Sequence, residues 1–461
     1  MRLPEGWTLE PLGGVSGIRA GVGFPERLQG RREGPIPVFK VGDISKAWLS
    51  GNRFLDAAQH YLTDQDVATL RAATFAGGST VFAKIGAALH LNRRAVLANP
   101  SLVDNNVFAV TPGEAVDDLF LYYFMCTQRL GELSRGGVVP SLRQSDVAGV
   151  HLPLAPLPEQ RRVVAKIEEL FSHLDAGVAA LERAEAKLKR YRASVLKSAV
   201  EGKLTDEWRD SFQESNWRSV GEAIISIEQG WSPRCESDPA PDHSTWGVIK
   251  TTAVQHLSFE ERENKTLPVS LRPRPELELK VGDILVTRAG PRSRVGVACL
   301  VRHTRPRLIL CDKVYRLRVR PETILPEFLE IVLNAPPVLE AVERLKSGIS
   351  DSGVNLTQQR FCEVRLPIPH TDAQRSVVSS VGSLLVAAGR STSDVCLSRD
   401  RAAALRRSIL KRAFEGRLVP QDPTDEPASV LLERIHAARA TKTPKNARAR
   451  RNPTQPALDL R

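Results

Sequence analysis

The stretch LKSAVEGKL (196–204) returns almost unchanged as LKRAFEGRL (410–418). The two copies lie 214 positions apart, and the match extends backwards in the same register, without a gap, to Gln160-Arg161 and Gln374-Arg375. Further upstream the match needs gaps. The period is far longer than that of solenoid repeats, so the chain is predicted to be two copies of one unit and not an array.

Four weaker segment pairs support the duplication upstream of the helix endings. They are LPLAPLPEQ (152–160) with LPIPHTDAQ (366–374), Ser141-Leu142 with Asn355-Leu356, FAGGSTVFAKIG (75–86) with LKVGDILVTRAG (279–290), and EGWTLEPLGG (5–14) with SNWRSVGEAI (215–224).

The front part of each unit is rich in Gly, Pro and β-branched residues, which favour strands and turns. VGDILVTRAG (281–290) predicts a strand that runs into a glycine turn, and residues 316–320 alternate with the period of a half-exposed strand. PEFLEIVLNAP (326–336) predicts a helix between strands. We therefore expect an α+β fold class, with two α/β-type front domains that each contain a twisted, mixed sheet.

The back part of each unit predicts a long helix, because its apolar residues recur at alternating intervals of four and three. Polar Glu185 and Arg192 interrupt the first stripe, and Thr392, Arg399 and Arg406 interrupt the second. The predicted helix-pair interface consists of Ile167, Phe171, Leu174, Val178, Leu181, Leu188 and Val195 in the first copy, and Val381, Leu385, Ala388, Val395, Ala402, Ile409 and Ala413 in the second.

Each helix is predicted to span about 42 residues, on the order of 60 Å, and to end at a glycine suited to a left-handed cap, Gly202 or Gly416. A helix of this length with one apolar stripe needs a partner, and the other copy supplies it. We predict an antiparallel pair with pseudo-two-fold symmetry. The predicted segments are a front domain (1–154), a helix (155–203), a front domain (204–368), a helix (369–432) and a basic, disordered tail (433–461).

The composition favours a polyanionic partner. The net charge is +12 over 461 residues, which suggests nucleic acid, although a generally Arg-rich surface would give the same total. The six cysteines form no CxxC pair and the nine histidines show no zinc spacing, so reduced thiols in a cytosolic protein are expected. No stretch is long and apolar enough for a membrane span or a signal peptide.

Three motifs for chemistry are weak. Asn334-Ala335-Pro336-Pro337 lacks the aromatic residue of an adenine-methyltransferase loop, and is interpreted as a helix stop. Pro241-Asp242 with Glu278-Leu279-Lys280 fits a metal-dependent nuclease only loosely, and the first copy has no equivalent. Gly21-Val22-Gly23 alone does not indicate a nucleotide site.

Two variable domains, each followed by a similar long helix, resemble the specificity subunit of type I restriction-modification enzymes. The resemblance covers about residues 1–435, and the second helix start departs from it with HTDAQ, Gly382 and Gly389. The segments that carry it are LPEGW (3–7), LKVGDILVTRAG (279–290), APLPEQRRVVAKIEEL (155–170), TDAQRSVVSSVGSLL (371–385), SVLKSAVEGKLT (194–205) and SILKRAFEGRLV (408–419).

The resemblance implies a non-catalytic subunit in which each front domain, a target-recognition domain, binds one half of a split DNA target. The helix pair would set the spacing and dock two methyltransferase subunits, and a restriction subunit would join for cleavage. S-adenosylmethionine, Mg and ATP would belong to those partners, and the chain would hold no cofactor or metal itself.

Sequence readout needs donors that reach base edges, and affinity needs cations for phosphates. The candidates for DNA binding follow the glycine turns in both copies. They are Lys84, Arg93, Arg94, Ser141, Arg143 and Gln144 in the first copy, and Arg288, Arg292, Ser293, Arg294, Asn355, Thr357, Gln358 and Gln359 in the second. A structural adaptor that binds only proteins through its helices is the alternative.

Overall fold

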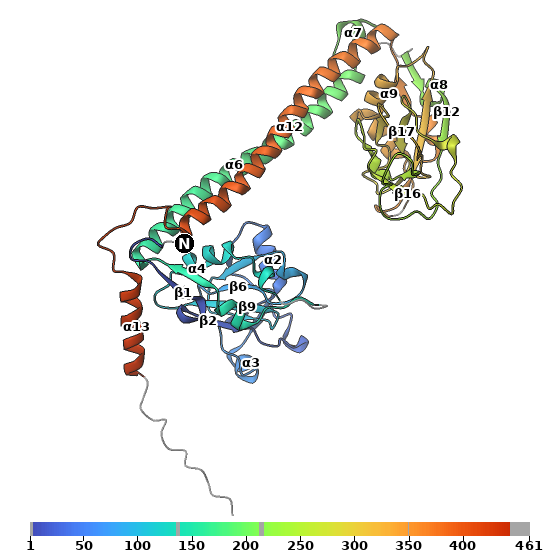
Figure 1. Ribbon diagram of the computed structural model, residues 1–461. Helices are drawn as coiled ribbons and strands as arrows, with labels where there is room; N and C mark the ends of the chain where they lie inside the picture. Colours follow the sequence, from blue (N-terminus) through green and yellow to red (C-terminus); the bar gives the residue numbers. More distant parts are fainter. Residues whose placement is uncertain (1–2, 135–138, 212–215, 349, 443–461) are drawn as a thin grey trace, which may run out of the picture. The chain divides into compact units, whose positions relative to one another are not determined.

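The computed structural model describes residues 3–134, 139–211, 216–348 and 350–442. The chain divides into two compact units (Figure 1). Unit 1 comprises Met1–Ala179 and Arg399–Arg461, and unit 2 comprises Ala180–Ser398. Each unit contains a mixed helix-and-sheet domain together with the start of one long helix and the end of the other.

Unit 1 is built on two sheets. The five-stranded sheet has the order β2 (Ser16–Ala20), β9 (Val107–Pro112), β6 (Thr80–Ala83), β7 (Arg94–Leu97) and β4 (Phe54–Leu55). The three-stranded sheet has the order β5 (His60–Leu62), β3 (Ile36–Phe39) and β8 (Leu102–Val103), and a separate strand pair joins β1 (Thr8–Pro11) to β10 (His151–Leu154). The helices of this domain are α1 (Leu12–Val15), α2 (Val41–Leu49), α3 (Asp64–Thr69), α4 (Asp118–Thr127) and α5 (Gln144–Ala148).

Helices cover both faces of the five-stranded sheet. Successive strand residues point to opposite faces, so Phe82 packs in one core with α4 while its neighbour Val81 packs in another with α2. Both faces are therefore apolar, and all four residues of β6 are buried.

Unit 2 repeats this topology. Its four-stranded sheet has the order β12 (Ile224–Gln229), β21 (Val314–Val319), β17 (Ile284–Thr287) and β19 (Ala298–Leu300), and its three-stranded sheet has the order β16 (Asn264–Thr266), β13 (Gly247–Ile249) and β20 (Leu308–Ile309). The strand pairs are β11 (Trp217–Ser219) with β23 (Arg365–Pro367), β14 (Val254–Gln255) with β15 (Ser258–Phe259), and β18 (Ala289–Gly290) with β22 (Val354–Asn355). Its helices are α7 (Asp206–Ser211), α8 (Val220–Ala223), α9 (Pro326–Leu333), α10 (Pro336–Leu345) and α11 (Gln358–Cys362).

The two three-stranded sheets have the same mixed pairing. β3 pairs antiparallel with β5 and parallel with β8, and β13 pairs antiparallel with β16 and parallel with β20. The predicted duplication and the α+β fold class are confirmed. The predicted correspondence of EGWTLEPLGG (5–14) with SNWRSVGEAI (215–224) is wrong by two residues. The N–H of Leu12 donates to Val150 as that of Val220 donates to Val364, so Trp7 does not correspond to Trp217.

Two equivalent glycines explain the Gly-x-Gly sequence. A Cβ atom on Gly21 would lie 2.1 Å from the carbonyl oxygens of Val103 and Asp104, and one on Gly230 would lie 2.1 Å from that of Leu310. In both units the chain entering the three-stranded sheet therefore approaches its neighbour too closely for a side chain. Gly21, the first glycine of Gly21-Val22-Gly23, therefore has a packing role.

The long helices α6 (Leu157–Val200) and α12 (Thr371–Phe414) are antiparallel in both units (Figure 1). In unit 1 the start of α6, with Ile167, shares a core with the end of α12, with Ile409. In unit 2 the end of α6, with Val195, shares a core with the start of α12, with Val381. Ala388, Val395 and Ala413 are also buried, and the half-buried members of the predicted interface are Phe171, Leu174, Val178, Leu181, Leu188, Leu385 and Ala402.

Three of the five polar interruptions, Arg192, Thr392 and Arg406, have partners across the helix pair. In unit 2 the Arg192 guanidinium donates to Thr392 Oγ1 at 3.0 Å and to the Ala388 carbonyl at 3.3 Å. In unit 1 Arg406 pairs with Asp175 and lies 4.9 Å from the centroid of the Phe171 ring. Both helices end as predicted at glycines with positive φ, Gly202 at 69° and Gly416 at 65°.

A buried glutamine fastens each long helix to its domain. The Gln160 side chain accepts from the N–H of Asp117 at 2.8 Å and donates to the carbonyls of Ala115 and Ala155 at 2.8 and 2.9 Å. Gln374 forms the same three bonds in unit 2, with the N–H of Leu325 and the carbonyls of Thr323 and Pro369.

Replacing Gln160 with leucine should destabilise unit 1 by about 3 kcal/mol. The apolar side chain keeps the volume but leaves three polar groups unpaired, each of which costs about 1–3 kcal/mol when buried. Urea-induced unfolding of the full chain measures the change. The exposed Gln65→Leu variant is the matched control, and equal stability of the two variants would contradict the fastening role.

The segment predicted to be a disordered tail begins within a helix, so its predicted start at 433 is wrong. Helix α13 (Ala428–Lys442) is held because Leu432 and Ile435 pack into the unit 1 core and the N–H of Ala428 donates to the Gly6 carbonyl at 2.9 Å. The remaining residues of that prediction, 443–461, lie outside the described residues.

Candidate nucleic-acid interface

In unit 1, Lys84 of the first predicted group lies at one corner of the domain with the second group, Ser141, Arg143 and Gln144. The chain leaves β6 at Lys84, whose carbonyl accepts from the N–H of Leu142 at 3.0 Å, and the next residue forms an isolated bridge with Ser141. Helix α5 starts immediately afterwards, so Arg143 and Gln144 are exposed beside Lys84.

The same corner recurs in unit 2. The carbonyl of Arg288 accepts from the N–H of Leu356 at 2.8 Å, and β18 pairs with β22 so that Ala289 faces Asn355. Helix α11 follows, and it leaves the polar residues Asn355, Thr357, Gln358 and Gln359 exposed. The predicted correspondence of Ser141-Leu142 with Asn355-Leu356 is confirmed by this pairing.

A partly anchored cation occupies the same place in both corners. Lys84 is half-buried, and its Nζ donates to the Asn105 carbonyl at 3.1 Å. Arg288 donates through Nη1 to the Asp312 carbonyl at 3.0 Å and lies 5.5 Å from the centroid of the Tyr315 ring. A guanidinium has five N–H donors and an ammonium three, so one carbonyl leaves donors for a phosphate or a base edge.

Arg94 is not a DNA contact, contrary to the prediction. It belongs to β7, its side chain is 1% exposed, and its guanidinium donates to the carbonyls of Asn92 and Gln128. A fully buried arginine must satisfy its charge inside the fold, and here it ties β7 to the end of α4. Arg93 is half-buried beside it, and its DNA contact remains a prediction.

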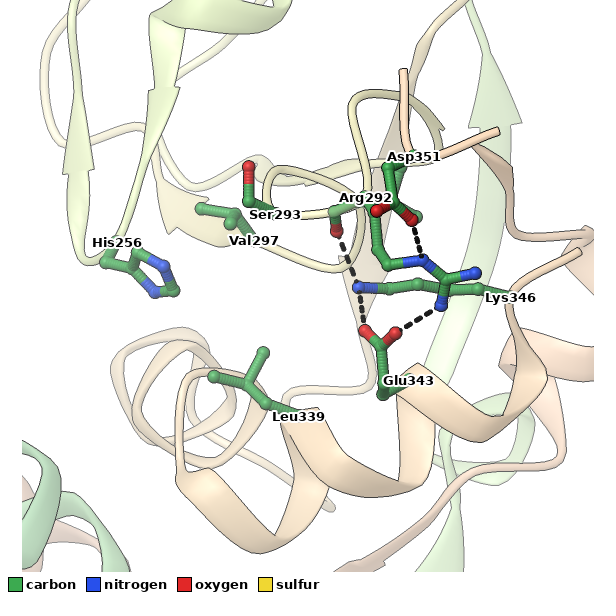
Figure 2. A pocket seen from close by; sticks show the side chains of 9 residues that line it. His256, Arg292, Ser293, Val297, Leu339, Glu343, Lys346 and Asp351 are labelled. Atoms are coloured by element: carbon green, nitrogen blue, oxygen red, sulfur yellow. Dashed lines mark hydrogen bonds and ion pairs between the residues drawn. The ribbon is translucent and has the colours of Figure 1, made fainter. Parts of the chain in front are cut away.

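Arg292 and Ser293 line a cavity of about 480 Å³ (Figure 2), and Arg294 is not among its lining residues. Arg292 pairs with Glu343 and with Asp351, the latter at 3.0 Å. Lys346 donates to Glu343 at 2.6 Å. Two cations and two carboxylates face one another here, so the cavity has no excess charge.

The Arg292 network and Arg294 serve the local fold. Hydrogen bonds from Lys346 and then from Arg292 hold the pKa of Glu343 below its usual range, which keeps the carboxylate charged. Arg294 donates to the carbonyls of Thr251 and Val254, both at 2.9 Å. Of the three candidates, Ser293 alone is exposed and lines the cavity without an ion pair.

The residues of the weak catalytic motifs have structural partners. Asp242 accepts hydrogen bonds from Ser244 and then Thr245, which lower its pKa to about 2. Glu278 accepts from the N–H of Arg307 at 2.5 Å. Asn334 ends α9 and donates to the Ala298 carbonyl at 2.8 Å, as a helix stop would. Among the described residues, no group of three or more His, Cys, Asp and Glu side chains could hold a metal ion.

Comparison with known proteins shows similarity to type I specificity subunits. Residues 4–184 match the family model for the type I restriction modification DNA specificity domain. The EcoKI specificity subunit of Escherichia coli K12 is 24% identical over 97% of this chain and 98% of its own length.

Two further proteins are similar to this chain. The EcoEI specificity subunit of Escherichia coli is 43% identical over 165 residues, which cover 36% of this chain and 28% of that relative. A chain in a solved structure of a type I R-M system matches with a TM-score of 0.65 at 18% identity, over 90% of this chain and all of that chain. That likeness shows the shared fold.

A second cation, absent from the predicted site residues, has the same place in both copies of the unit. Lys40 follows β3 and Lys250 follows β13, which are the central strands of the two equivalent three-stranded sheets. The short echo of VFK (38–40) in VIK (248–250) was the available signal. In the described part of the chain, no helix has the length and apolar character needed to cross a bilayer.

Proposed function

We propose that this chain is the non-catalytic DNA-specificity subunit of a type I restriction-modification complex. Its two domains each bind one half of a split, asymmetric DNA target. The observation that supports this is the repeated corner. The same backbone frame presents Lys84, Arg143 and Gln144 in one copy, and unlike side chains such as Arg288 and Asn355 in the other. A common frame with different donors suits two different half-sites.

The same proposal assigns the chemistry to other subunits. Two methyltransferase subunits and restriction subunits would assemble on this chain in the cytoplasm. S-adenosylmethionine, Mg and ATP would be bound by those subunits, and no cofactor by this one. The relatives that cover the full length of the chain are named as specificity subunits of restriction enzymes.

Selection from a randomised pool of DNA duplexes tests the proposal. The full chain should enrich two different short sequences at a fixed separation, in the presence of unrelated competitor DNA. Affinity should fall steeply as salt rises, with a slope of log affinity against log salt of about −0.9 for each phosphate neutralised. If no sequence were enriched and DNA affinity did not depend on salt, the result would instead support a structural adaptor that binds only proteins.

A methylation assay tests the division of labour. The purified chain with S-adenosylmethionine and its selected duplex should transfer no methyl group, and should direct methylation only when methyltransferase subunits are added. Methyl transfer by the chain alone would overturn the non-catalytic assignment.

A further inference from the structure

A small cavity in unit 2 gathers three lysines from three segments. Its volume is about 250 Å³. Lys250 follows β13, Lys265 lies on the neighbouring strand β16, and Lys313 immediately precedes β21. Lys265 and Lys313 are exposed and Lys250 is half-buried, while Val248 and Cys311 form an apolar floor.

The cavity is strongly positive, because little offsets the three ammonium groups. Of the residues that line it, none is acidic. Glu263 lies 3.8 Å from Lys250 Nζ, but it also accepts from Thr252 Oγ1 at 2.5 Å. Among the ion pairs within the described residues, none involves Lys265 or Lys313. This balance differs from the cavity beside Arg292, where two carboxylates offset two cations.

The neutral residues of the cavity leave that charge intact. Burial raises the pKa of Cys235 and raises that of Cys311 to about 12, so both thiols stay protonated at neutral pH. Ser232 pairs with Asp312, whose N–H donates back to Ser232 Oγ at 3.1 Å. That carboxylate is therefore engaged at the rim and does not line the cavity.

The cavity adjoins the corner that holds the base-reading candidates. The carbonyl of Lys313 accepts from the N–H of Arg288 at 2.9 Å, and the carbonyl of Arg288 accepts from the N–H of Leu356 at 2.8 Å. Asn355 immediately precedes Leu356 in the chain, and Gln358 follows it by two residues. Lys313 thus lies one backbone hydrogen bond away from the cation of the corner, and Lys250 and Lys265 share its cavity.

We infer that Lys250, Lys265 and Lys313 form a subsite for a backbone phosphate of the DNA bound by unit 2. This inference rests on the proposed function and specifies where the second domain holds the backbone next to its base-reading corner. Lysine suits this task, because an ammonium is a compact point charge that binds a phosphate without bidentate base recognition.

Among the described residues of the first domain, the positions equivalent to Lys250 and Lys313 form no such subsite. Lys40, the counterpart of Lys250, donates to Gln29 Oε1 at 2.7 Å and lies 5.2 Å from the centroid of the Phe24 ring. Asn106 stands where unit 2 has Lys313, because the N–H of Lys84 donates to Asn106 as that of Arg288 donates to Lys313. The subsite therefore belongs to one half of the target.

The test compares the full chain with its K250Q/K265Q/K313Q variant on the selected duplex and on an unrelated duplex. Affinity should fall about equally for both duplexes, by roughly tenfold or more, while the preference between them stays the same. The slope of log affinity against log salt should become shallower by about 0.9 for each phosphate that the variant no longer neutralises. An unchanged slope, or a changed base preference, would overturn the subsite.

Three controls keep the outcomes separate. K280Q, which removes an exposed lysine outside the cavity, should leave the slope unchanged. The double variant K265Q/K313Q keeps half-buried Lys250, so it tests the subsite even if the triple variant unfolds. It should show part of the loss of affinity and part of the change in salt slope. Absence of salt-dependent sequence selection by the unaltered chain would be a failure of the proposed function itself.

Duplexes with single neutral methylphosphonate linkages distinguish a DNA phosphate from a free anion. At one linkage of the half-site bound by unit 2, the substitution should weaken binding by the unaltered chain and have little effect on the triple variant. Inorganic phosphate should compete no better than chloride at equal ionic strength. Sensitivity of both proteins at every linkage alike, or strong competition by phosphate, would overturn the assignment to DNA backbone.

Discussion

Replacing Arg316 with methionine should destabilise the second domain by about 3–5 kcal/mol and weaken selection of one half of the DNA target. Arg316 lies on β21 with its side chain 1% exposed. It donates to the carbonyls of Glu278 and Glu276 at 2.8 and 2.9 Å, and pairs with Glu228. Its Nη1 lies 3.8 Å from Asp283, whose side chain is 4% exposed.

The cost follows from what methionine leaves behind. Breaking a buried ion pair by removing one partner costs about 3–5 kcal/mol, because the other charge stays buried without compensation. Burial already raises the pKa of Asp283, although a hydrogen bond from the Lys280 N–H and the charge of Arg316 oppose that rise. Without the guanidinium, two backbone carbonyls lose a donor, and Asp283 keeps only the Lys280 N–H and the more exposed Arg318.

Arg318→Met is the matched control for this substitution. Arg318 lies on the same strand, 3.8 Å from Glu228 and 3.7 Å from Asp283, but its side chain is 43% exposed. An exposed pair contributes about 0–1 kcal/mol, so the free energy of unfolding of this variant should lie within about 1 kcal/mol of that of the unaltered chain. Equal destabilisation by the two substitutions, measured by urea-induced unfolding, would show that burial is not the cause.

The destabilisation caused by Arg316→Met should also depend on pH. Burial alone would raise the pKa of Glu228, but hydrogen bonding and charge from Arg316 hold it below its usual range, so its contribution is present at neutral pH and is lost on acidification. In the variant, protonation relieves the uncompensated carboxyls. The difference in free energy of unfolding should therefore shrink as pH falls from 7 towards about 4, near the ordinary carboxyl pKa values.

Substituting alanine for both Leu432 and Ile435 should destabilise unit 1 by about 4 kcal/mol or more, since each buried Leu or Ile→Ala change costs about 2–5 kcal/mol. Both side chains are 8% exposed in the core that also contains Trp7 and Phe414. The segment before them adds an ion pair, in which Arg162 Nη2 lies 2.6 Å from Asp425. Selection of the half-site bound by the first domain should weaken with the loss of stability.

Val430→Ala provides the control on the same helix, because Val430 is 46% exposed and should change stability by less than about 0.5 kcal/mol. A chain that ends at Lys442 should also unfold like the full chain, since it keeps all of α13. Thermal and urea unfolding measure both. If the double substitution left unit 1 as stable as Val430→Ala does, α13 would have no structural role.

Local and periodic features were predictable from the sequence. The apolar stripes of α6 and α12 required a partner, and the duplication supplied one, so the pairing of the two helices followed from the positions of residues such as Ile167 and Ile409. Gly202 and Gly416 marked both helix ends, because a left-handed cap has a sequence signature. The strand that runs into the corner at Arg288 was also predictable, because strand-forming residues followed by a glycine turn are a local sequence signature.

The roles of individual charged residues were decided by the tertiary structure. Arg93 and Arg94 are neighbours in sequence, but pairing of β7 with β6 turns Arg94 into the core while Arg93 stays half-exposed. Arg292 is held by Glu343 and Asp351, which lie more than fifty residues away in the chain. The pattern of cations in the sequence could not separate these cases.

The sequence by itself determined that this protein is a duplicated unit with an α+β domain and a long helix in each copy, because periodicity and repetition are properties of the chain alone. Only the tertiary structure decided which cations face outwards together. Lys250, Lys265 and Lys313 are brought to one cavity by strand pairing between distant segments, and such long-range pairing leaves no local pattern in the sequence.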